Sequence, residues 1–440
     1  MSSVAIALGS LVLMLALIYA GLHVAITLGL LSFVGVWLIR GDVEVAANLL
    51  AQAVSDAIAS HIFGVVPLFV LTGFLVAQAD VGKDAFEVAN QAFRRIRGGL
   101  GVATVAANAV FAAITGISIA SAAVFTRVAV PQMLRFGYRA PFAVGVVTGS
   151  SVLGMLIPPS LLMILYGFLS GQSVGDLFTA GILPGVLLAL AYAVLIILLA
   201  RWRPSLVFEA GGERRSHDES LMPLAEMVRK MVPAVLLIGL VLGGIYAGWF
   251  TATEAGAVGA ALALAVALLR RKLDWKSFWS VLTETGHVTV SVSFLIICAS
   301  IYTRMLAMSG TPQALVAWMA AAGLGVAAFL AIYVLLVVLL GTVVDSSSIM
   351  LIVLPLMLPV AEQLGLNLVW FGVVTVVAVE IGLLTPPFGL SAYVVKSTLG
   401  ANVDITLGDI FRGTAPFTLT MFVVLVLLLL FPWFSLALLK

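Results

Sequence analysis

Long apolar runs, separated by short polar segments, follow one another along the whole chain. A helix that crosses the hydrocarbon core of a bilayer needs roughly 20 apolar residues, and many of these runs reach that length. We therefore predict an all-α polytopic membrane protein. The first run has no basic residue before it and leads directly into a second, so we expect a mature helix rather than a signal peptide. The ten predicted crossings are 3–20, 22–39, 60–79, 141–169, 179–200, 231–248, 254–269, 281–301, 367–398 and 414–436.

Two further apolar stretches, 99–134 and 327–362, are too long for a single crossing at about 1.5 Å per residue. Small polar residues interrupt each one near its middle, as TGISIAS at 115–121 and GTVVDSSS at 341–348. We interpret each stretch as a re-entrant helical hairpin. An irregular break at membrane depth is tolerated only where it is buried in protein or lines a cavity. The two breaks are therefore candidate functional sites.

The polar segment 201–230 divides the chain into two similar halves. The motif GMLIPP at 154–159 recurs as GLLTPP at 382–387, and both lie within predicted crossings, which we expect to be broken helices. Each half would hold five crossings and one hairpin. Because five is odd, the second half would be inverted relative to the first, as in many secondary transporters. We predict two inverted-topology repeats, 1–200 and 231–440, joined by a cytoplasmic linker.

The distribution of charge favours the same topology. Lysine and arginine are retained on the cytoplasmic side of membrane proteins, and here they gather in the predicted loops 80–98, 201–230 and 270–276. This arrangement puts both termini on the outer side of the membrane. The segments 40–59 and 270–280 connect equivalent helices of the two halves. The second carries aromatic and basic residues, so we expect an interfacial helix, which either braces the fold or simply anchors it at the membrane surface.

Composition excludes several other classes of protein. Hydrophobic residues make up 62% of the 440 residues and charged residues 10%, whereas soluble domains are about 25% charged. The single cysteine excludes a disulfide framework, and the four scattered histidines form no local metal motif. A net charge of +2, carried by topological lysines and arginines, gives no reason to expect nucleic-acid binding.

Three stretches resemble a known transporter family. They are AITGISIASAAVFTRVAVPQMLRFGYRAPFAVGVVTGSSVLGMLIPPSLLMILYG, GIYAGWFTATEAGAVGA, and LGTVVDSSSIMLIVLPLMLPVAEQLG followed by EIGLLTPPFGL. The family is the large membrane subunit of TRAP transporters, the tripartite ATP-independent periplasmic transporters of the C4-dicarboxylate and sialic acid type. The resemblance covers essentially the whole chain. The chain departs from the usual family pattern at Ala252, Ala378, Ser391 and Arg127.

The resemblance implies a sodium-coupled elevator transporter that receives an acidic solute from a soluble periplasmic binding protein. It also implies a small four-helix membrane subunit, which we expect to be a separate chain. Na⁺ would be the coupling ion, and no organic cofactor is expected. The implied sodium sites lie where each hairpin tip faces a broken helix, and their ligands would be Thr115, Gly116, Ser118, Gly154, Ser160, Gly341, Asp345, Gly382 and Thr385.

The chemistry of a helix break agrees with this implication. Carbonyls freed by unwinding can ligate a hard cation such as sodium, and helix N-termini attract anions. Asp345 is the main candidate for the charge in the site, because a carboxylate within the membrane costs about 2.5–3.5 kcal/mol and usually has a function. The other polar residues considered for substrate binding are Ser121, Ser150, Ser346, Glu380, Arg127 and Arg304.

Each substrate candidate has a structural alternative. Serines in membrane helices often permit close packing, arginines near helix ends often reach toward lipid head groups, and Glu380 could pair with a basic residue. Glu254 follows Thr251 by three residues and fits a capping box, so we assign it a structural role.

We therefore expect sodium-coupled symport of a small organic acid. The alternative is a proton-coupled or other secondary anion transporter of the same architecture. A passive channel needs a continuous polar pore, which two closed hairpins do not favour. An intramembrane enzyme ranks last, because the chain has no His-Glu-x-x-His motif and Asp345 has no partner aspartate in a Gly-x-Gly-Asp motif. The chain also has no Walker A motif for ATP.

Overall fold

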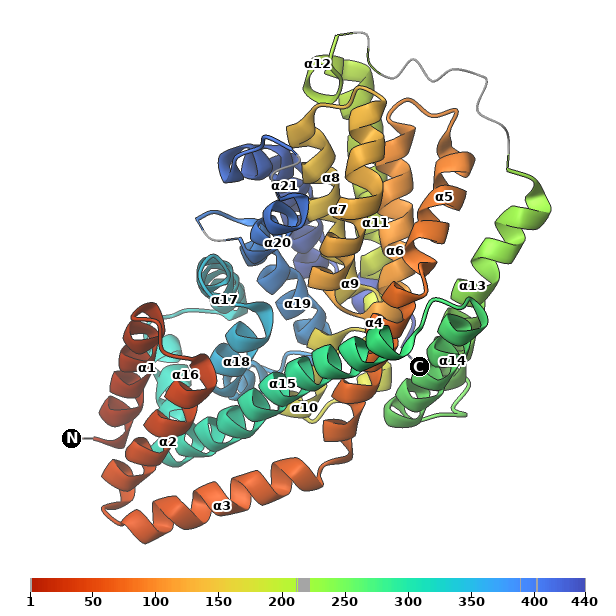
Figure 1. Ribbon diagram of the computed structural model, residues 1–440. Helices are drawn as coiled ribbons and strands as arrows, with labels where there is room; N and C mark the ends of the chain where they lie inside the picture. The colour runs from red at the N-terminus through yellow and green to blue at the C-terminus, as the bar shows by residue number, and fades with distance from the viewer. Residues whose placement is uncertain (1, 211, 213–221, 388, 401–402, 440) are drawn as a thin grey trace.

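The computed structural model describes residues 2–210, 212, 222–387, 389–400 and 403–439. The middle of the predicted linker, including His217, lies outside these ranges. Over the described residues the chain is helical and contains no strand, apart from one isolated bridge between Tyr138 and Phe208 (Figure 1). The helices are α1 (Ser3–Tyr19), α2 (Val24–Arg40), α3 (Val43–Ala59), the 3₁₀-helix η1 (His61–Gly64), α4 (Val65–Gln78), α5 (Val81–Phe93), α6 (Gly99–Thr115), α7 (Ser118–Arg135), α8 (Ala140–Ser151), α9 (Leu153–Leu156), α10 (Leu161–Ser170), α11 (Val174–Trp202), α12 (Pro204–Val207), α13 (Leu224–Tyr246), α14 (Ala252–Leu269), α15 (Trp275–Ser309), α16 (Thr311–Ala321), α17 (Val326–Gly341), α18 (Ser346–Gln363), α19 (Leu368–Leu384), α20 (Leu390–Leu399), α21 (Leu407–Leu430) and α22 (Trp433–Leu436).

The number of full-length crossings is smaller than the ten predicted. Seven segments of the described residues are long and apolar enough to cross a membrane when α8 to α10 are counted as one, or eight if α4 and α5, which meet at 60°, also count as one span. The helices α1, α2 and α19 are apolar but have 17 residues each. In α2 the difference lies at the start, where His23 has an extended backbone and the helix begins at Val24 rather than at residue 22.

The predicted loop 80–98 is wrong in part, because it contains the 13-residue helix α5. One face of α5 buries Val81, Ala85 and Phe86, and the helix packs against α6 and α7. The spacing of these residues is amphipathic, which permits a helix in a segment that is too polar to cross the bilayer.

The interfacial helix expected at 270–280 is continuous with the crossing that follows it. Asp274 caps the 35-residue helix α15, which continues through the predicted crossing 281–301 to Gly310. In Figure 1 this helix runs obliquely across the molecule from α14 toward α2. Its far half is tied to α3 by an ion pair between Arg304 and Asp56 at 2.6 Å. The segment beyond Arg40, expected to connect helices, forms α3.

Both stretches expected to be hairpins consist of two packed helices. The first contains α6 and α7 with a break at 116–117, and the second contains α17 and α18 with a break at 342–345. Breaks at 157–160 and 385–389 interrupt the helices that carry the proline motifs, and the two Pro-Pro bonds there are cis. The assignment of the halves to inverted repeats stays a prediction.

Candidate functional site

The tip of the first hairpin lies against the break between α9 and α10. Gly116 has φ of +66°, and a Cβ atom added there would lie 2.5 Å from the carbonyl oxygen of Pro159. The Leu161 N–H donates a hydrogen bond of 3.2 Å to the Gly116 carbonyl oxygen. A Cβ atom added at Gly154 would lie 3.0 Å from the Ile117 backbone. Two glycines thus allow the two interrupted backbones to touch.

The predicted polar ligands of the first site gather at this contact. The Ser160 hydroxyl donates to the Met155 carbonyl and accepts a hydrogen bond of 3.3 Å from the Met163 N–H, so Ser160 caps α10. The Thr115 hydroxyl donates to Phe111 O at 3.0 Å. The hydroxyls of Ser118 and Ser121 are buried and have no hydrogen-bond partner among the described residues. The structure therefore brings the predicted ligands together and leaves the Ser118 oxygen available.

The tip of the second hairpin lies against α19 through two glycines. A Cβ atom added at Gly382 would lie 2.5 Å from the Gly341 Cα atom, and one added at Gly341 would lie 2.6 Å from the Gly382 Cα atom. Thr385 ends α19 next to this contact. Its N–H donates to Gly382 O at 3.0 Å and its hydroxyl donates to Ile381 O at 2.7 Å.

Asp345 lies at the start of α18, where it acts as the N-cap. Its carboxylate accepts hydrogen bonds from the Ser348 N–H at 3.1 Å and the Ser348 hydroxyl at 2.5 Å. The half-buried side chain lines an open pocket of about 590 Å³ together with His23 and His287. Both carboxylate oxygens are thus engaged within the first turn of α18. A role for Asp345 as a sodium ligand stays a prediction.

Glu380 is the carboxylate that lies between the two hairpins. It is fully buried within α19, and the Ser346 hydroxyl donates to its Oε1 atom at 3.0 Å. The Ser118 hydroxyl neighbours the same carboxyl group, yet neither Ser118 Oγ nor Glu380 Oε2 completes a hydrogen bond within the described structure. Ser118 and Ser346 are the first residues of α7 and α18. One carboxyl group therefore neighbours both tips.

Sequence reasoning missed a buried asparagine near the first hairpin. Asn108 in α6 donates to the Ser150 hydroxyl at 2.6 Å, and that hydroxyl donates to Val146 O at 2.7 Å. Asn108 Oδ1 has no partner in the described part of the chain. A lone amide within the apolar run of 99–115 was the available signal, because buried polar groups in membrane helices are costly.

The two arginines considered for substrate binding lie away from the tips. Arg304 belongs to α15 and pairs with Asp56 of α3. Arg127 is exposed on α7, nine residues beyond Ser118. The expected capping box is confirmed, since Thr251 accepts from the Glu254 N–H and the Glu254 carboxylate accepts from the Thr251 N–H.

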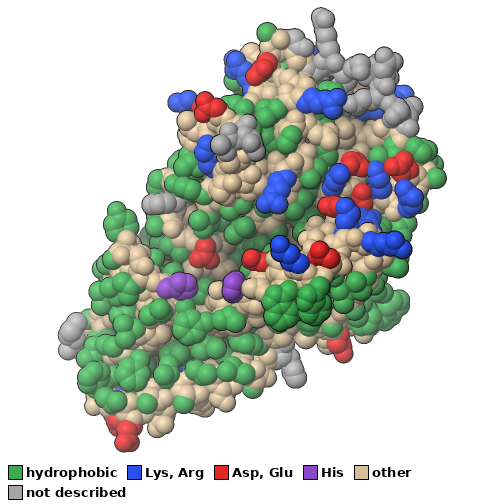
Figure 2. Space-filling view, in the orientation of Figure 1, with side chains coloured by type: hydrophobic (Ala, Val, Ile, Leu, Met, Phe, Trp, Pro, Cys, Tyr) green, Lys and Arg blue, Asp and Glu red, His purple; other side chains and the backbone are tan. Residues whose placement is uncertain are grey.

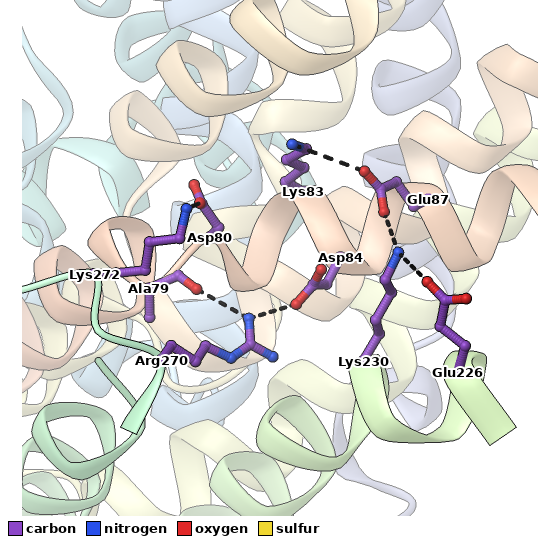
Figure 3. Close-up of polar contacts among 9 residues, drawn as sticks. All are labelled: Ala79, Asp80, Lys83, Asp84, Glu87, Glu226, Lys230, Arg270 and Lys272. Carbon is purple, nitrogen blue, oxygen red and sulfur yellow. Dashed lines mark hydrogen bonds and ion pairs between the residues drawn. The ribbon is translucent and has the colours of Figure 1, made fainter. Parts of the chain in front are cut away.

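A cluster of ion pairs joins α5 to the helices beyond the linker (Figure 3). Arg270 donates to the Asp84 carboxylate and, at 3.0 Å, to Ala79 O. Lys272 pairs with Asp80 at 2.8 Å. Several basic residues expected only to set topology therefore also connect distant parts of the chain. A second branch of the cluster links Lys230 of α13 to Glu87 at 2.5 Å and Glu226 at 3.2 Å, with Lys83 at 4.0 Å from Glu87.

The surface separates charged from apolar regions. Figure 2 shows charged side chains gathered near α5 and α13, whereas apolar side chains cover most of the lower part of this face. Exposed apolar residues are numerous on the long helices, among them Leu190, Leu269 and Leu419. A surface of this kind fits a protein whose helices contact lipid.

Comparisons with known proteins identify related sequences over nearly the whole chain. The family described as the tripartite ATP-independent periplasmic transporter, DctM component, matches residues 11–434. The chain is 35% identical to the C4-dicarboxylate TRAP transporter large permease protein DctM of Pseudomonas aeruginosa, over 85% of each chain. It is 31% identical to the sialic acid TRAP transporter large permease protein SiaM of Vibrio cholerae, over 98% of this chain and 97% of that one.

The fold is also similar to that of solved membrane transporters. The crystal structure of the Alcanivorax borkumensis YdaH transporter aligns with a TM-score of 0.60 and 16% sequence identity, covering 90% of each chain. The likeness at this identity concerns the fold alone. The relatives are named as transporter permeases, which confirms the expectation that this chain is not an enzyme.

Proposed function

Because this chain belongs to the DctM family of tripartite ATP-independent periplasmic transporters, we propose that it is a large permease subunit that takes up a small organic acid by sodium symport. Relatives are named for C4-dicarboxylates and for sialic acid, both of which are acidic solutes. A carboxylate of this kind is the substrate class we assign. The membrane would be the bacterial inner membrane, with both termini on the periplasmic side.

The observation that carries the proposal is the direct contact between each hairpin tip and the helix that faces it. Gly116 and Gly154 permit this contact in the first half, and Gly341 and Gly382 permit it in the second. Helix ends at such contacts present carbonyl oxygens that have no intrahelical partner. Sodium is a hard cation that takes several oxygen ligands. Sodium bound at these contacts would lock the tips in place.

The protein's own residues would supply most of each shell. Ser118 offers a buried hydroxyl that has no partner among the described residues, and Ser160 and Thr115 lie at the same contact. At the second tip Thr385 follows the Gly341 and Gly382 contact. The N-termini of α7 and α18 begin at the tips and carry partial positive charge, which favours an anionic substrate there.

An elevator motion fits a site in which sodium and the substrate both bind at the hairpin tips. Hairpins whose tips are seated by sodium would carry the acid as one body past the surrounding helices, so that empty hairpins without sodium stay in place. The word tripartite in the family description supports two further components. We assign these as a small four-helix membrane subunit and a periplasmic binding protein that delivers the acid.

Reconstituted vesicles test the function directly. We expect uptake of a labelled C4-dicarboxylate or sialic acid only when the vesicles contain this chain with the small subunit, the binding protein is present and sodium is higher outside. Choline in place of sodium is the matched control. Uptake that persists in choline and follows an imposed proton gradient would assign the chain to proton-coupled transport instead. Uptake that needs ATP would refute symport altogether.

A further inference from the structure

The carboxyl group of Glu380 is in an unusual position for a buried acid. Its side chain is 0% exposed, and it lies within α19, two residues before the glycine that contacts the second hairpin. Ser346 at the start of α18 donates to Oε1 at 3.0 Å. Ser118 at the start of α7 neighbours the same carboxyl group from the first hairpin. Residues from both halves of the chain thus meet at one carboxyl group.

Two oxygen atoms at this position have no hydrogen-bond partner among the described residues. They are Oε2 of Glu380 and Oγ of Ser118, and both are buried. Buried polar atoms are nearly always paired, so each such exception calls for an explanation. Because the two atoms belong to neighbouring groups, one bound species between them would satisfy both.

Within the described residues, no lysine or arginine forms an ion pair with Glu380. Among the elements packed on α19, Lys396 of α20 donates to Ile405 O at 2.5 Å, and Asp345 of α18 is held by Ser348. Glu362 of α18 is exposed, and Asp409 and Arg412 lie together in the first turns of α21. The remaining titratable groups on packed elements are Asp176, Tyr192 and Arg201 of α11, Tyr393 of α20, Tyr166 of α10, which donates to Leu368 O, and Tyr333 of α17, which bonds to Thr375.

We propose that Glu380 supplies the negative charge of a sodium site that the two hairpin tips share, with Ser118 and Ser346 as its neutral oxygen ligands. The inference rests on the proposed sodium coupling and assigns the charge within that site. Buried charges in proteins are paired or bind a metal ion, and a carboxylate with two hydroxyls is a donor set suited to a hard monovalent cation. Asp345 is the weaker candidate for this role, since each of its oxygens already accepts a hydrogen bond from Ser348.

The shared site makes the seating of the two tips interdependent. Ser118 approaches Glu380 only when the first hairpin is in place, and Ser346 only when the second is in place. Sodium bound between them therefore stabilises the arrangement in which both tips are seated. Removal of the ion leaves an uncompensated carboxylate between two hairpins.

Thermal unfolding of the purified full-length protein in detergent tests this without measuring transport. The unfolding midpoint is followed as sodium replaces choline at constant ionic strength. In the wild type the midpoint should rise with sodium. In Glu380→Gln the concentration for half-maximal rise should increase at least about tenfold, because site charge sets the affinity for hard cations. The midpoint in choline should stay equal or rise, since the amide carries no buried charge.

Two further variants complete the test. Asp345→Asn removes the competing carboxylate and should raise the half-maximal sodium concentration less than Glu380→Gln does, while its amide still caps α18. Glu284→Gln removes an exposed carboxylate from α15 and should leave the response unchanged.

An unaltered half-maximal concentration in Glu380→Gln would overturn the assignment of charge to Glu380, and a large increase confined to Asp345→Asn would transfer it to Asp345. Absence of any sodium response in the wild type would instead overturn the proposed sodium coupling. Ser118→Ala is a second test. It should raise the sodium concentration for the half-maximal rise of the midpoint, although the Glu380 charge is retained.

Discussion

Four glycines allow the hairpin tips to approach neighbouring backbone. A Cβ atom at Gly116 would lie 2.5 Å from a carbonyl oxygen, and one at Gly382 would lie 2.5 Å from the Gly341 Cα atom. Distances this short exclude any side chain at these positions unless the backbone moves. Gly154 and Gly341 have similar surroundings. The absence of a side chain is thus the chemical property that these positions require.

Gly382→Ala should therefore destabilise the protein by about 1–3 kcal/mol, the usual cost of overpacking. The matched control is Gly239→Ala in α13, where a Cβ atom would meet nothing within 4 Å. There the helix propensity of alanine should leave stability unchanged or raise it by up to about 1 kcal/mol. Unfolding midpoints of the two purified variants measure the difference. Equal midpoints would show that the second tip does not need the close approach.

At this scale the sequence located the breaks in the helices more readily than the side chains that surround them. The breaks were recognisable because Gly, Ser and Thr interrupt apolar runs. Asp345 drew attention as a carboxylate inside such a break, and Glu380 was considered for the substrate. Which side chains approach Glu380 depends on where the first residues of α7 and α18 lie relative to α19. This arrangement joins residues more than 200 positions apart, and no local pattern reports it.

The ion-pair cluster defines how one helix is held against several others. The helix α5 presents Asp84 to Arg270, and their side chains are 16% and 23% exposed. Arg270 also reaches Ala79 O, at the corner where α4 turns into α5. These bonds fix α5, and with it the first hairpin, against the loop that leads into α15.

Arg270→Gln should cost about 1–3 kcal/mol in stability, because it leaves the partly buried Asp84 carboxylate without its charged partner. Lys83→Met offers a matched control, since Lys83 is 56% exposed and 4.0 Å from Glu87. Exposed pairs of this kind contribute little, and a change within about 0.5 kcal/mol is expected. Unfolding of both variants at low salt tests the contrast. A similar loss in both would mean that burial does not matter at this corner.

The cap of α15 should respond to acid in a defined direction. Hydrogen bonds from Ser277, including its N–H at 2.7 Å, lower the pKa of Asp274. A lowered pKa stabilises the folded state above the unfolded pKa of about 3.9, and this contribution disappears as pH falls through the lowered value. Asp274→Asn keeps a capping side chain but removes the charge. Wild type should thus exceed this variant in stability at neutral pH, and the difference should vanish in strong acid.

The boundaries of elements were harder to predict than their presence. Apolar runs placed the hairpin helices and broken helices within a few residues of their positions in the structure. The prediction failed at α5 and α15, where amphipathic segments continue or replace what looked like surface loops. A membrane surface and a protein surface both accept such segments, so local polarity alone does not locate their ends.

At the scale of the whole molecule, the predicted inversion relates the ends of the two hairpins. Arg135 ends α7 and Gln363 ends α18, and both side chains are exposed. Inverted repeats require these equivalent ends to lie on opposite sides of the membrane. The distribution of basic residues agrees with this inversion. The connector after α7 carries Arg135 and Arg139, whereas residues 364–368 after α18 carry no lysine or arginine.

Cysteine labelling tests the inversion in a Cys298→Ser background. We expect Arg135→Cys to react with a membrane-impermeant reagent only from the cytoplasm and Gln363→Cys only from the periplasm. A cysteine within 211–219, in the linker, should also be labelled from the cytoplasm and serves as the control. Labelling of both hairpin ends from one side would contradict the inverted repeats.

The length of α15 has a consequence for how the protein senses its lipid surroundings. At about 1.5 Å per residue its 35 residues extend about 52 Å, well beyond a hydrocarbon core of about 30 Å, so the helix meets the bilayer at a tilt. Trp275 and Trp279 are exposed at one end, where aromatic rings favour the head-group level. Further along, α15 packs on α18 of the second hairpin. A thicker bilayer should make the helix more upright and shift its contact with α18. Uptake by reconstituted vesicles should therefore peak at one acyl-chain length when the lipids are varied.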